Sequence, residues 1–290
     1  MKFKLLQINK KQCLTLLLIT LFVAIFRIIL QVFIPSSETS PLPPSVIVKA
    51  GLLPFAFTIF AIVVYGALAI VFFLIQDNLQ GTGIRKGFIF GIAFCIMWFV
   101  YLFEPVPYVF EQSLLEFLSY PFVDGAAILV LGLLLGKFIG TDTQGSRKVT
   151  ISYSLVTVVS ISLFFLVPRY LNYSIFSSYS SFTTRPILTM IWTLAGGISI
   201  GIVYLLLSPG IIMKSNLLKA VYFGFVVIGI DLFLFNCFVP LVFDQSVFGS
   251  LSRAMQDIVP IIVGVYVAEK ILFRLELKQK SNTFNRNTLK

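Results

Sequence analysis

Eight apolar segments, each about long enough to cross a lipid bilayer, constrain this chain more than any other feature of its sequence. A helix rises about 1.5 Å per residue, so about 20 residues cross about 30 Å of hydrocarbon. Lipid also suits the composition, because 58% of the 290 residues are hydrophobic and only 12% are charged. We therefore predict an all-α polytopic membrane protein with eight transmembrane helices. Their expected limits are 13–34, 53–75, 87–105, 122–140, 149–168, 187–207, 218–239 and 257–274.

The basic residues between these segments predict the orientation of the chain. Seventeen of the 22 Lys and Arg residues lie near the two termini or in every second connection. Such residues concentrate on the cytoplasmic side of membrane proteins. We expect both termini in the cytoplasm, with the chain in a plasma membrane of bacterial type. The net charge of +10 is then explained by the basic residues of the cytoplasmic connections and termini. The expected partner is the lipid bilayer and not nucleic acid, while a protein partner or a homo-oligomer stays open.

The residue types that are scarce in this chain exclude several kinds of chemistry. There is no histidine, and the three cysteines, Cys13, Cys95 and Cys237, stand far apart in the sequence. Ser-His-Asp and Cys-His catalysis and histidine-ligated metal sites are thereby ruled out. We predict no cofactor and no metal, and the sequence favours a non-enzymatic protein over an enzyme.

An internal repeat is the most specific pattern in the sequence. The octapeptide 106–113 recurs 133 residues later at 239–246 as V-P-x-V-F-acid-Q-S, and 15 of the 52 positions in 86–137 are identical at this offset. Shared polar residues are not expected from hydrophobicity alone. Four helices per unit keep both units in the same orientation, as in parallel repeats related by an axis along the membrane normal. We predict four-helix repeats at 1–140 and 141–276, followed by a basic cytoplasmic tail at 277–290.

The repeated motif places acids and amides at the outer side of the predicted bilayer. A ring of carboxylates there would attract cations and could line an outer vestibule. The alternative is that Asp124 and Asp257 open helices four and eight and cap their free N–H groups. The residues of this candidate vestibule are Glu111, Gln112, Asp124, Asp244, Gln245 and Asp257.

Charged residues inside or beside the apolar segments form a second candidate site. Arg27 and Asp231 lie at nearly equal predicted depth, so they could form an ion pair that joins the two repeats, and Glu104 lies near the same face. Such residues are costly in hydrocarbon and should face protein or water. Asp231 could instead serve a substrate or a proton, and Arg27 could extend alone toward the interface. In the repeat, Asp231 aligns with Trp98.

Glycines at a spacing of four predict close helix packing. They occur at Gly87 and Gly91, at Gly132, Gly136 and Gly140, and at Gly197 and Gly201. Small residues at this spacing let helix backbones approach each other. We interpret them as packing surfaces.

Three functions are compatible with these features. The first is a transporter or permease for a small solute or ion, which predicts a hydrated cavity between the repeats that contacts Asp231. The second is a non-enzymatic accessory, immunity or sensory subunit acting through a partner, which predicts a dry interior. The third is a lipid-modifying membrane enzyme, which the outer carboxylates allow.

Overall fold

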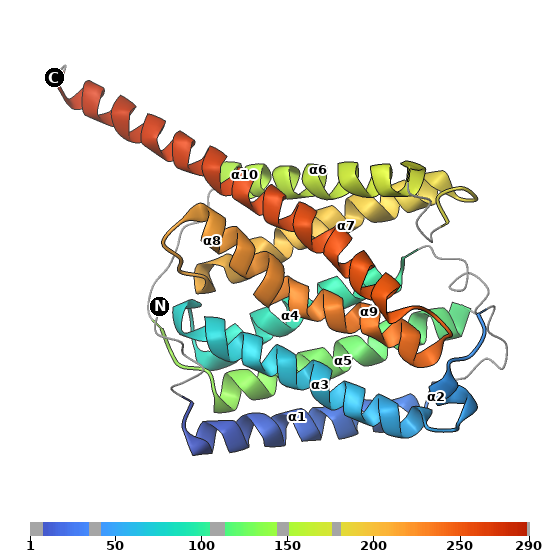
Figure 1. The fold of residues 1–290 in the computed structure, drawn as a ribbon. Coiled ribbons are helices and arrows are strands. Elements are labelled where there is room, and N and C mark those ends of the chain that lie inside the picture. The colour runs from blue at the N-terminus through green and yellow to red at the C-terminus, as the bar shows by residue number, and fades with distance from the viewer. Residues whose placement is uncertain (1–7, 35–41, 105–113, 144–150, 176–180, 289–290) are drawn as a thin grey trace.

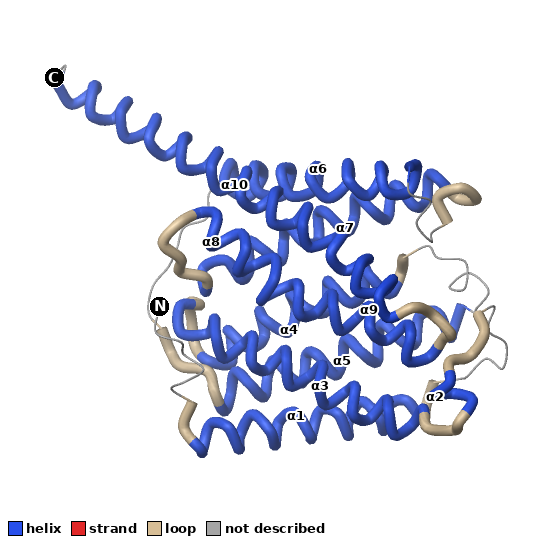
Figure 2. The backbone as a smooth tube through the Cα atoms, in the orientation of Figure 1, coloured by secondary structure: helices blue, strands red, loops and turns tan. Residues whose placement is uncertain are grey.

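The structure is a computed structural model that describes residues 8–34, 42–104, 114–143, 151–175 and 181–288. Helices dominate it, and short loops join them (Figures 1 and 2). The described residues contain two isolated β-bridges, Pro44 with Phe243 and Gly81 with Thr143, and no β-strand. The helices are α1 (Lys10–Gln31), α2 (Val46–Lys49), α3 (Leu53–Ile75), η2 (Gln76–Asn78), α4 (Gly83–Leu102), α5 (Leu114–Phe138), α6 (Ile151–Ile175), α7 (Pro186–Leu207), η4 (Ser208–Gly210), α8 (Asn216–Val221), the π-helix η5 (Tyr222–Gly229), α9 (Ile230–Val242) and α10 (Val247–Thr288).

Within the described residues, seven helical stretches are long and apolar enough to cross a membrane. The prediction of an all-α, multi-pass membrane protein is confirmed at this level. The predicted eighth segment, 257–274, falls within α10 and carries four charged residues, which makes it less apolar than the other seven. α10 crosses the bundle and then projects past the other helices (Figure 1).

One stripe of each long helix faces the protein interior, and several charged residues belong to these stripes. In α1 the buried residues follow a spacing of three and four and include Arg27, while Leu17 and Phe22 on other faces are exposed. Asp124 in α5 and Asp257 in α10 are likewise buried beside apolar neighbours. A helix that is apolar all round can bury one face in protein and leave the rest to lipid. Packing that buries these stripes therefore carries the charges inside.

The bundle consists of two sets of helices that contact each other. In the first set α1 packs against α3 and α5, and α4 packs against α5; in the second, α6 packs against α7 and α10, while α10 also contacts α8, η5 and α9. Between the sets, α4 contacts α7 and α3 contacts α9. We call the end where α1, α4, α6 and α9 finish the carboxylate end, because it contains Glu104. The opposite end, which contains Lys86 and Lys219, is the lysine end.

Glycine brings α4 and α5 into backbone contact. A Cβ atom added at Gly87 would lie 2.0 Å from the carbonyl oxygen of Gly132, and one added at Gly132 would lie 2.4 Å from that of Gly87. In the second set, Gly197 and Gly201 of α7 lie against the backbone of α6. The interpretation of the spaced glycines as packing surfaces is confirmed.

Candidate functional site

A cavity of about 920 Å³ lies between the two sets of helices, in the half of the bundle nearer the carboxylate end. Its lining comes from α1, α3, α4, α5, α6, α9 and α10. It reaches from Trp98 and Phe235 to Gln245 and Ser246, in the connection between α9 and α10. Aromatic rings of Phe57, Phe60 and Phe238 cover part of the wall, and three arginines and three carboxylates occupy another part. The charged residues are Arg27, Glu104, Asp124, Arg169, Arg253 and Asp257.

Arg27 and Asp124 form the first buried ion pair of the cavity. The Nε of Arg27 donates to Oδ1 of Asp124, and its Nη1 donates to Oε1 of Gln31 at 2.5 Å. The guanidinium carbon lies 5.2 Å from the ring centroid of Phe57, within the range of a cation–π contact. The pairing with Asp231 that equal depth allowed is therefore not the one formed, because Asp124 reaches Arg27 from the neighbouring helix.

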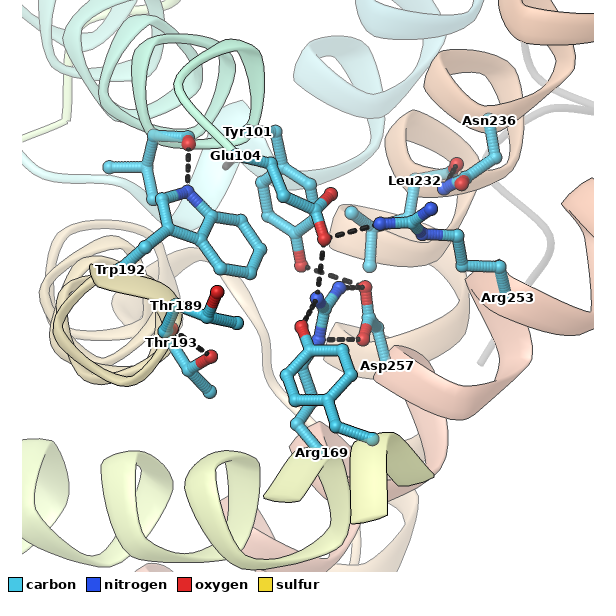
Figure 3. Close-up of polar contacts among 12 residues, drawn as sticks. Tyr101, Glu104, Arg169, Thr189, Trp192, Thr193, Leu232, Asn236, Arg253 and Asp257 are labelled. Atoms are coloured by element: carbon cyan, nitrogen blue, oxygen red, sulfur yellow. Dashed lines mark hydrogen bonds and ion pairs between the residues drawn. The ribbon is translucent and has the colours of Figure 1, made fainter. Parts of the chain in front are cut away.

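Arg169 forms the centre of a second and larger ionic cluster (Figure 3). Its Nε and Nη2 donate to the two carboxylate oxygens of Asp257 at 2.7 and 2.5 Å, a bidentate pair. Its Nη1 donates to Glu104 at 2.9 Å and to the hydroxyl of Tyr173 at 2.6 Å. Arg253 donates to the same oxygen of Glu104 from the other side. Two cations and two anions are thus held together in the cavity wall.

Aromatic residues complete the surroundings of Arg169. Its guanidinium carbon lies 4.7 Å from the ring centroid of Trp192, whose own Nε1 donates to the carbonyl of Val100. The hydroxyl of Tyr101 donates to Oδ2 of Asp257 at 3.2 Å. A buried ion pair is stable only when its remaining hydrogen-bonding capacity is satisfied. The hydroxyl groups of Tyr101 and Tyr173 form hydrogen bonds with Asp257 and Arg169, respectively.

Glu104 lies just beyond the end of α4 and is ionised at neutral pH. Burial raises the pKa of its carboxyl group, but the positive charges of Arg253 and Arg169 together outweigh this, so that its pKa lies below the usual 4.5. Opposite charges within a few ångströms favour the charged form. Glu104 therefore faces Arg169 and Arg253 as a carboxylate.

The two aspartates do not cap helices, as one reading of the sequence proposed. α5 begins at Leu114 and α10 at Val247, so that Asp124 and Asp257 each lie ten residues inside a helix. Both are buried, with exposed fractions of 8% and 1%. The helices begin earlier than expected because the predicted apolar segments omitted their first turns.

The remaining residues of the predicted vestibule fall into two groups. Glu111 and Gln112 lie outside the described residues. Asp244 and Gln245 are exposed; the backbone N–H of Asp244 donates to the carbonyl of Pro43 at 2.9 Å, and Gln245 lines the cavity. Of the six residues, the structure thus brings Asp124, Gln245 and Asp257 to the cavity.

Asp231 lies outside the ionic clusters and next to its repeat partner. It is 3% exposed, and its Oδ1 accepts a hydrogen bond from Nε1 of Trp98 at 2.9 Å. Trp98 lines the cavity, whereas Asp231 is not among the lining residues. The indole therefore stands between the cavity and this carboxylate, so the direct contact of the cavity with Asp231 that a transporter predicts is not observed.

Sequence reasoning missed Arg169, Arg253, Tyr101 and Tyr173. Arg169 follows the predicted segment 149–168 and so falls in the predicted connection after it, but α6 continues through Pro168 to Ile175. A signal was present, since Arg169 and Tyr173 are four residues apart, as are Arg27 and Gln31.

At the lysine end, two lysines at the beginnings of predicted segments are also buried. Lys86 donates to the carbonyl of Gln76 and to the hydroxyl of Thr143, both at 2.8 Å. Lys219 pairs with Glu269 at 2.8 Å. These contacts join neighbouring helices and lie apart from the cavity.

Fold and cavity together define an all-α, multi-pass membrane protein with a charged internal cavity. The comparisons with known proteins do not narrow this class: no family model matches the chain, and no match was found among curated proteins or solved structures. The geometry of the cavity is therefore the basis for its function.

Proposed function

We propose that the protein is a transporter or permease for a small amphipathic solute that binds in the cavity between the two sets of helices. The observation that supports this most is the cavity itself, with a volume of about 920 Å³. Sites for small molecules commonly measure about 300–1,000 Å³ and combine an apolar lining with a few polar groups. Here the polar groups are ionisable side chains inside the bundle, which are costly in a membrane and typical of solute pathways.

The two walls of the cavity suggest the chemistry of the solute. Phe57, Phe60 and Phe238 offer an aromatic surface on the side of α3 and α9. The Arg169 cluster offers both donors and acceptors on the side of α6 and α10. A molecule with an apolar body and a polar or zwitterionic group could contact both walls at once.

The alternative functions fit this geometry less well. An accessory or sensory subunit was expected to have a dry, packed interior, and the cavity argues against that. A lipid-modifying enzyme would need a free general acid or base, but Glu104, Asp124 and Asp257 are engaged by arginines. A general acid or base must be free to reach a proton of the substrate, and these carboxylates already accept hydrogen bonds from guanidinium groups.

We further propose that residues 1–140 and 141–276 are parallel repeats related by an axis along the membrane normal. Three observations support this. The contact of α4 with α7 has its counterpart in that of α9 with α3. An arginine of α1 pairs with Asp124, and one of α6 pairs with Asp257. Trp98 and Asp231, at equivalent positions, bond to each other, as residues beside a twofold axis would.

The proposed repeat requires eight crossings, with α10 as the eighth. Two features support this assignment. α10 is the equivalent of α5 in the proposed repeat, and it crosses the bundle. The distribution of basic residues supports cytoplasmic termini, which would place the carboxylate end and the cavity on the outer side of the plasma membrane.

The experiment is a cysteine-accessibility measurement across the membrane. In a background with Cys13, Cys95 and Cys237 replaced by alanine, Ala61→Cys places a thiol in the cavity wall. Val63→Cys, two residues away in α3 and 49% exposed on the outer surface of the bundle, is the matched control. An impermeant maleimide is added to right-side-out and inverted vesicles.

A transporter is expected to show labelling of Ala61→Cys from both sides and much weaker labelling of Val63→Cys. Labelling from one side only would support a binding or sensory protein instead of a transporter. Absence of labelling from either side would contradict a solvent-accessible cavity.

A further inference from the structure

Asp231 differs from the other buried carboxylates of the described residues in having no cationic partner. Arginines hold Asp124, Asp257 and Glu104. The partner of Asp231 is the neutral indole N–H of Trp98. Asp231 lies in the middle of an apolar stretch, 216–242, where an unpaired ionised carboxylate is costly.

Among the described residues, no lysine or arginine of the elements around Asp231 forms an ion pair with it. α9 packs against α2, α3, η5 and α10 and meets α4 through Trp98. The charged groups of α10 near the cavity, Arg253 and Asp257, are engaged by Glu104 and Arg169, and Glu269 of the same helix pairs with Lys219. The other titratable groups on these elements are Lys49 of α2, Tyr65 of α3, Tyr222 of η5, Cys237 of α9, Arg85, Lys86, Cys95 and Tyr101 of α4, and Tyr266, Lys270, Arg274, Glu276, Lys278, Lys280 and Arg286 of α10.

A buried carboxylate without a counter-ion can still become neutral by binding a proton. This changes its hydrogen bonding, because a carboxylate only accepts, whereas a carboxylic acid also donates. The bond from Trp98 is strongest to the ionised form, since hydrogen bonds to charged acceptors are about twice as strong as neutral ones. Binding of a proton therefore weakens the contact between α4 and α9.

The backbone next to Asp231 is itself unusual. Asp231 is the second residue after the π-helix Tyr222–Gly229. π-Helical turns are rare and occur frequently at functional sites. The equivalent stretch of α4 is regular α-helix. Asp231 and the π-helix thus belong to the same half, where they face Trp98 of the other half.

We propose that Asp231 is a proton-binding site and that its proton controls the Trp98 contact at the inner limit of the cavity. The proton comes from water, converts the carboxylate to a carboxylic acid and returns to water when the carboxylate forms again. This inference rests on the proposed transport function and adds proton coupling to it. Release of Trp98 on protonation would loosen the contact between the two halves below the solute.

Tryptophan fluorescence tests the proposal directly, because the chain has two tryptophans. In Trp192→Phe, Trp98 is the single reporter, and purified protein in detergent is titrated with acid in the absence of solute. The emission of Trp98 is expected to shift in one single-proton step. In Trp192→Phe with Asp231→Asn the step is expected to be lost, since the amide oxygen still accepts from the indole but cannot bind the proton.

Two further variants make the result decisive. Asp244→Asn, which removes an exposed carboxylate at the carboxylate end, is expected to retain the step. Asp231→Glu is expected to retain it with a displaced midpoint, which tests the site even where Asp231→Asn does not fold. A flat titration in Trp192→Phe, or a step that persists with Asp231→Asn, would overturn the proposal.

Failure of this inference can be told from failure of the proposed function. The fluorescence titration needs neither solute nor a membrane gradient, whereas cavity accessibility is read by maleimide labelling. A flat titration with two-sided labelling would leave a transporter without proton binding at Asp231. A clear step with one-sided labelling would leave a proton site in a protein that does not transport.

Discussion

At the scale of single residues, the site depends on charges that are buried in pairs. Arg27 with Asp124 and Arg169 with Asp257 each combine a guanidinium from one helix with a carboxylate from another. The gain from such a pair is small against hydrophobic packing of the same volume, but loss of one partner leaves an uncompensated charge. The pairs therefore fix which helices can be neighbours.

Replacement of Asp257 tests this at the better connected of the two pairs. Asp257→Asn removes the charge that faces Arg169 and is expected to lower the free energy of unfolding by about 3–5 kcal/mol. Denaturant unfolding in detergent micelles measures the change. Asp244→Asn is the control, since that side chain is exposed and the expected effect is within about 0.5 kcal/mol. Equal effects of the two substitutions would contradict a structural role for the pair.

The residues of the site were partly predictable. Arg27, Glu104, Asp124, Asp231 and Asp257 could be found because charge is rare in or beside apolar segments. Their partners could not, since residues at similar depth on different helices are indistinguishable until the packing is known.

At the scale of helices, two predicted limits were wrong beside a proline, because α5 begins before Pro121 and α6 continues past Pro168. Pro121, Pro168 and Pro260 all lie inside helices. Neighbouring helices can satisfy the backbone groups that a proline releases in a membrane helix. The limits of α3, Leu53–Ile75, agree with the prediction because its boundaries coincide with a change in polarity. The π-helix could not be foreseen, because its hydrogen-bond register leaves no mark in hydrophobic periodicity.

The glycine contact of α4 with α5 leads to a prediction about helix packing. Gly132→Ala would place a Cβ 2.4 Å from the carbonyl oxygen of Gly87, so the helices must separate. We expect a net destabilisation of about 1–3 kcal/mol, typical of overpacking, measured by unfolding in detergent. In the control Gly249→Ala, the nearest atom lies 3.6 Å away. A Gly132→Ala protein as stable as the control would show that the backbone contact is not tight.

At the scale of the whole molecule, seven helical stretches meet the length and hydropathy required of a span, and α10 is more charged. The number of crossings decides whether the two ends of the chain share a side. The class of fold was predictable from hydrophobicity, whereas the ionic partnerships that join the two sets of helices required the packed structure.

Topology reporters fused to each end test the proposed eight crossings. With eight crossings, a fluorescent reporter active only in the cytoplasm is expected to give signal at both the N-terminus and the C-terminus. A reporter inserted after Ser181, in the connection between α6 and α7, is the control and is expected to be silent. Signal at one terminus alone would mean an odd number of crossings and would remove α10 from the membrane.

The bond between Trp98 and Asp231 has a consequence for how such a protein can arise. Two separate, identical four-helix chains that assemble around a twofold axis must present the same amino acid from both sides where they meet at that axis. Two tryptophans would lack an acceptor there, and two aspartates would repel each other. Joining both halves in one polypeptide lifts this restriction, so that each half can mutate independently. A donor on one side and an acceptor on the other is a combination open to the fused chain and closed to a homodimer.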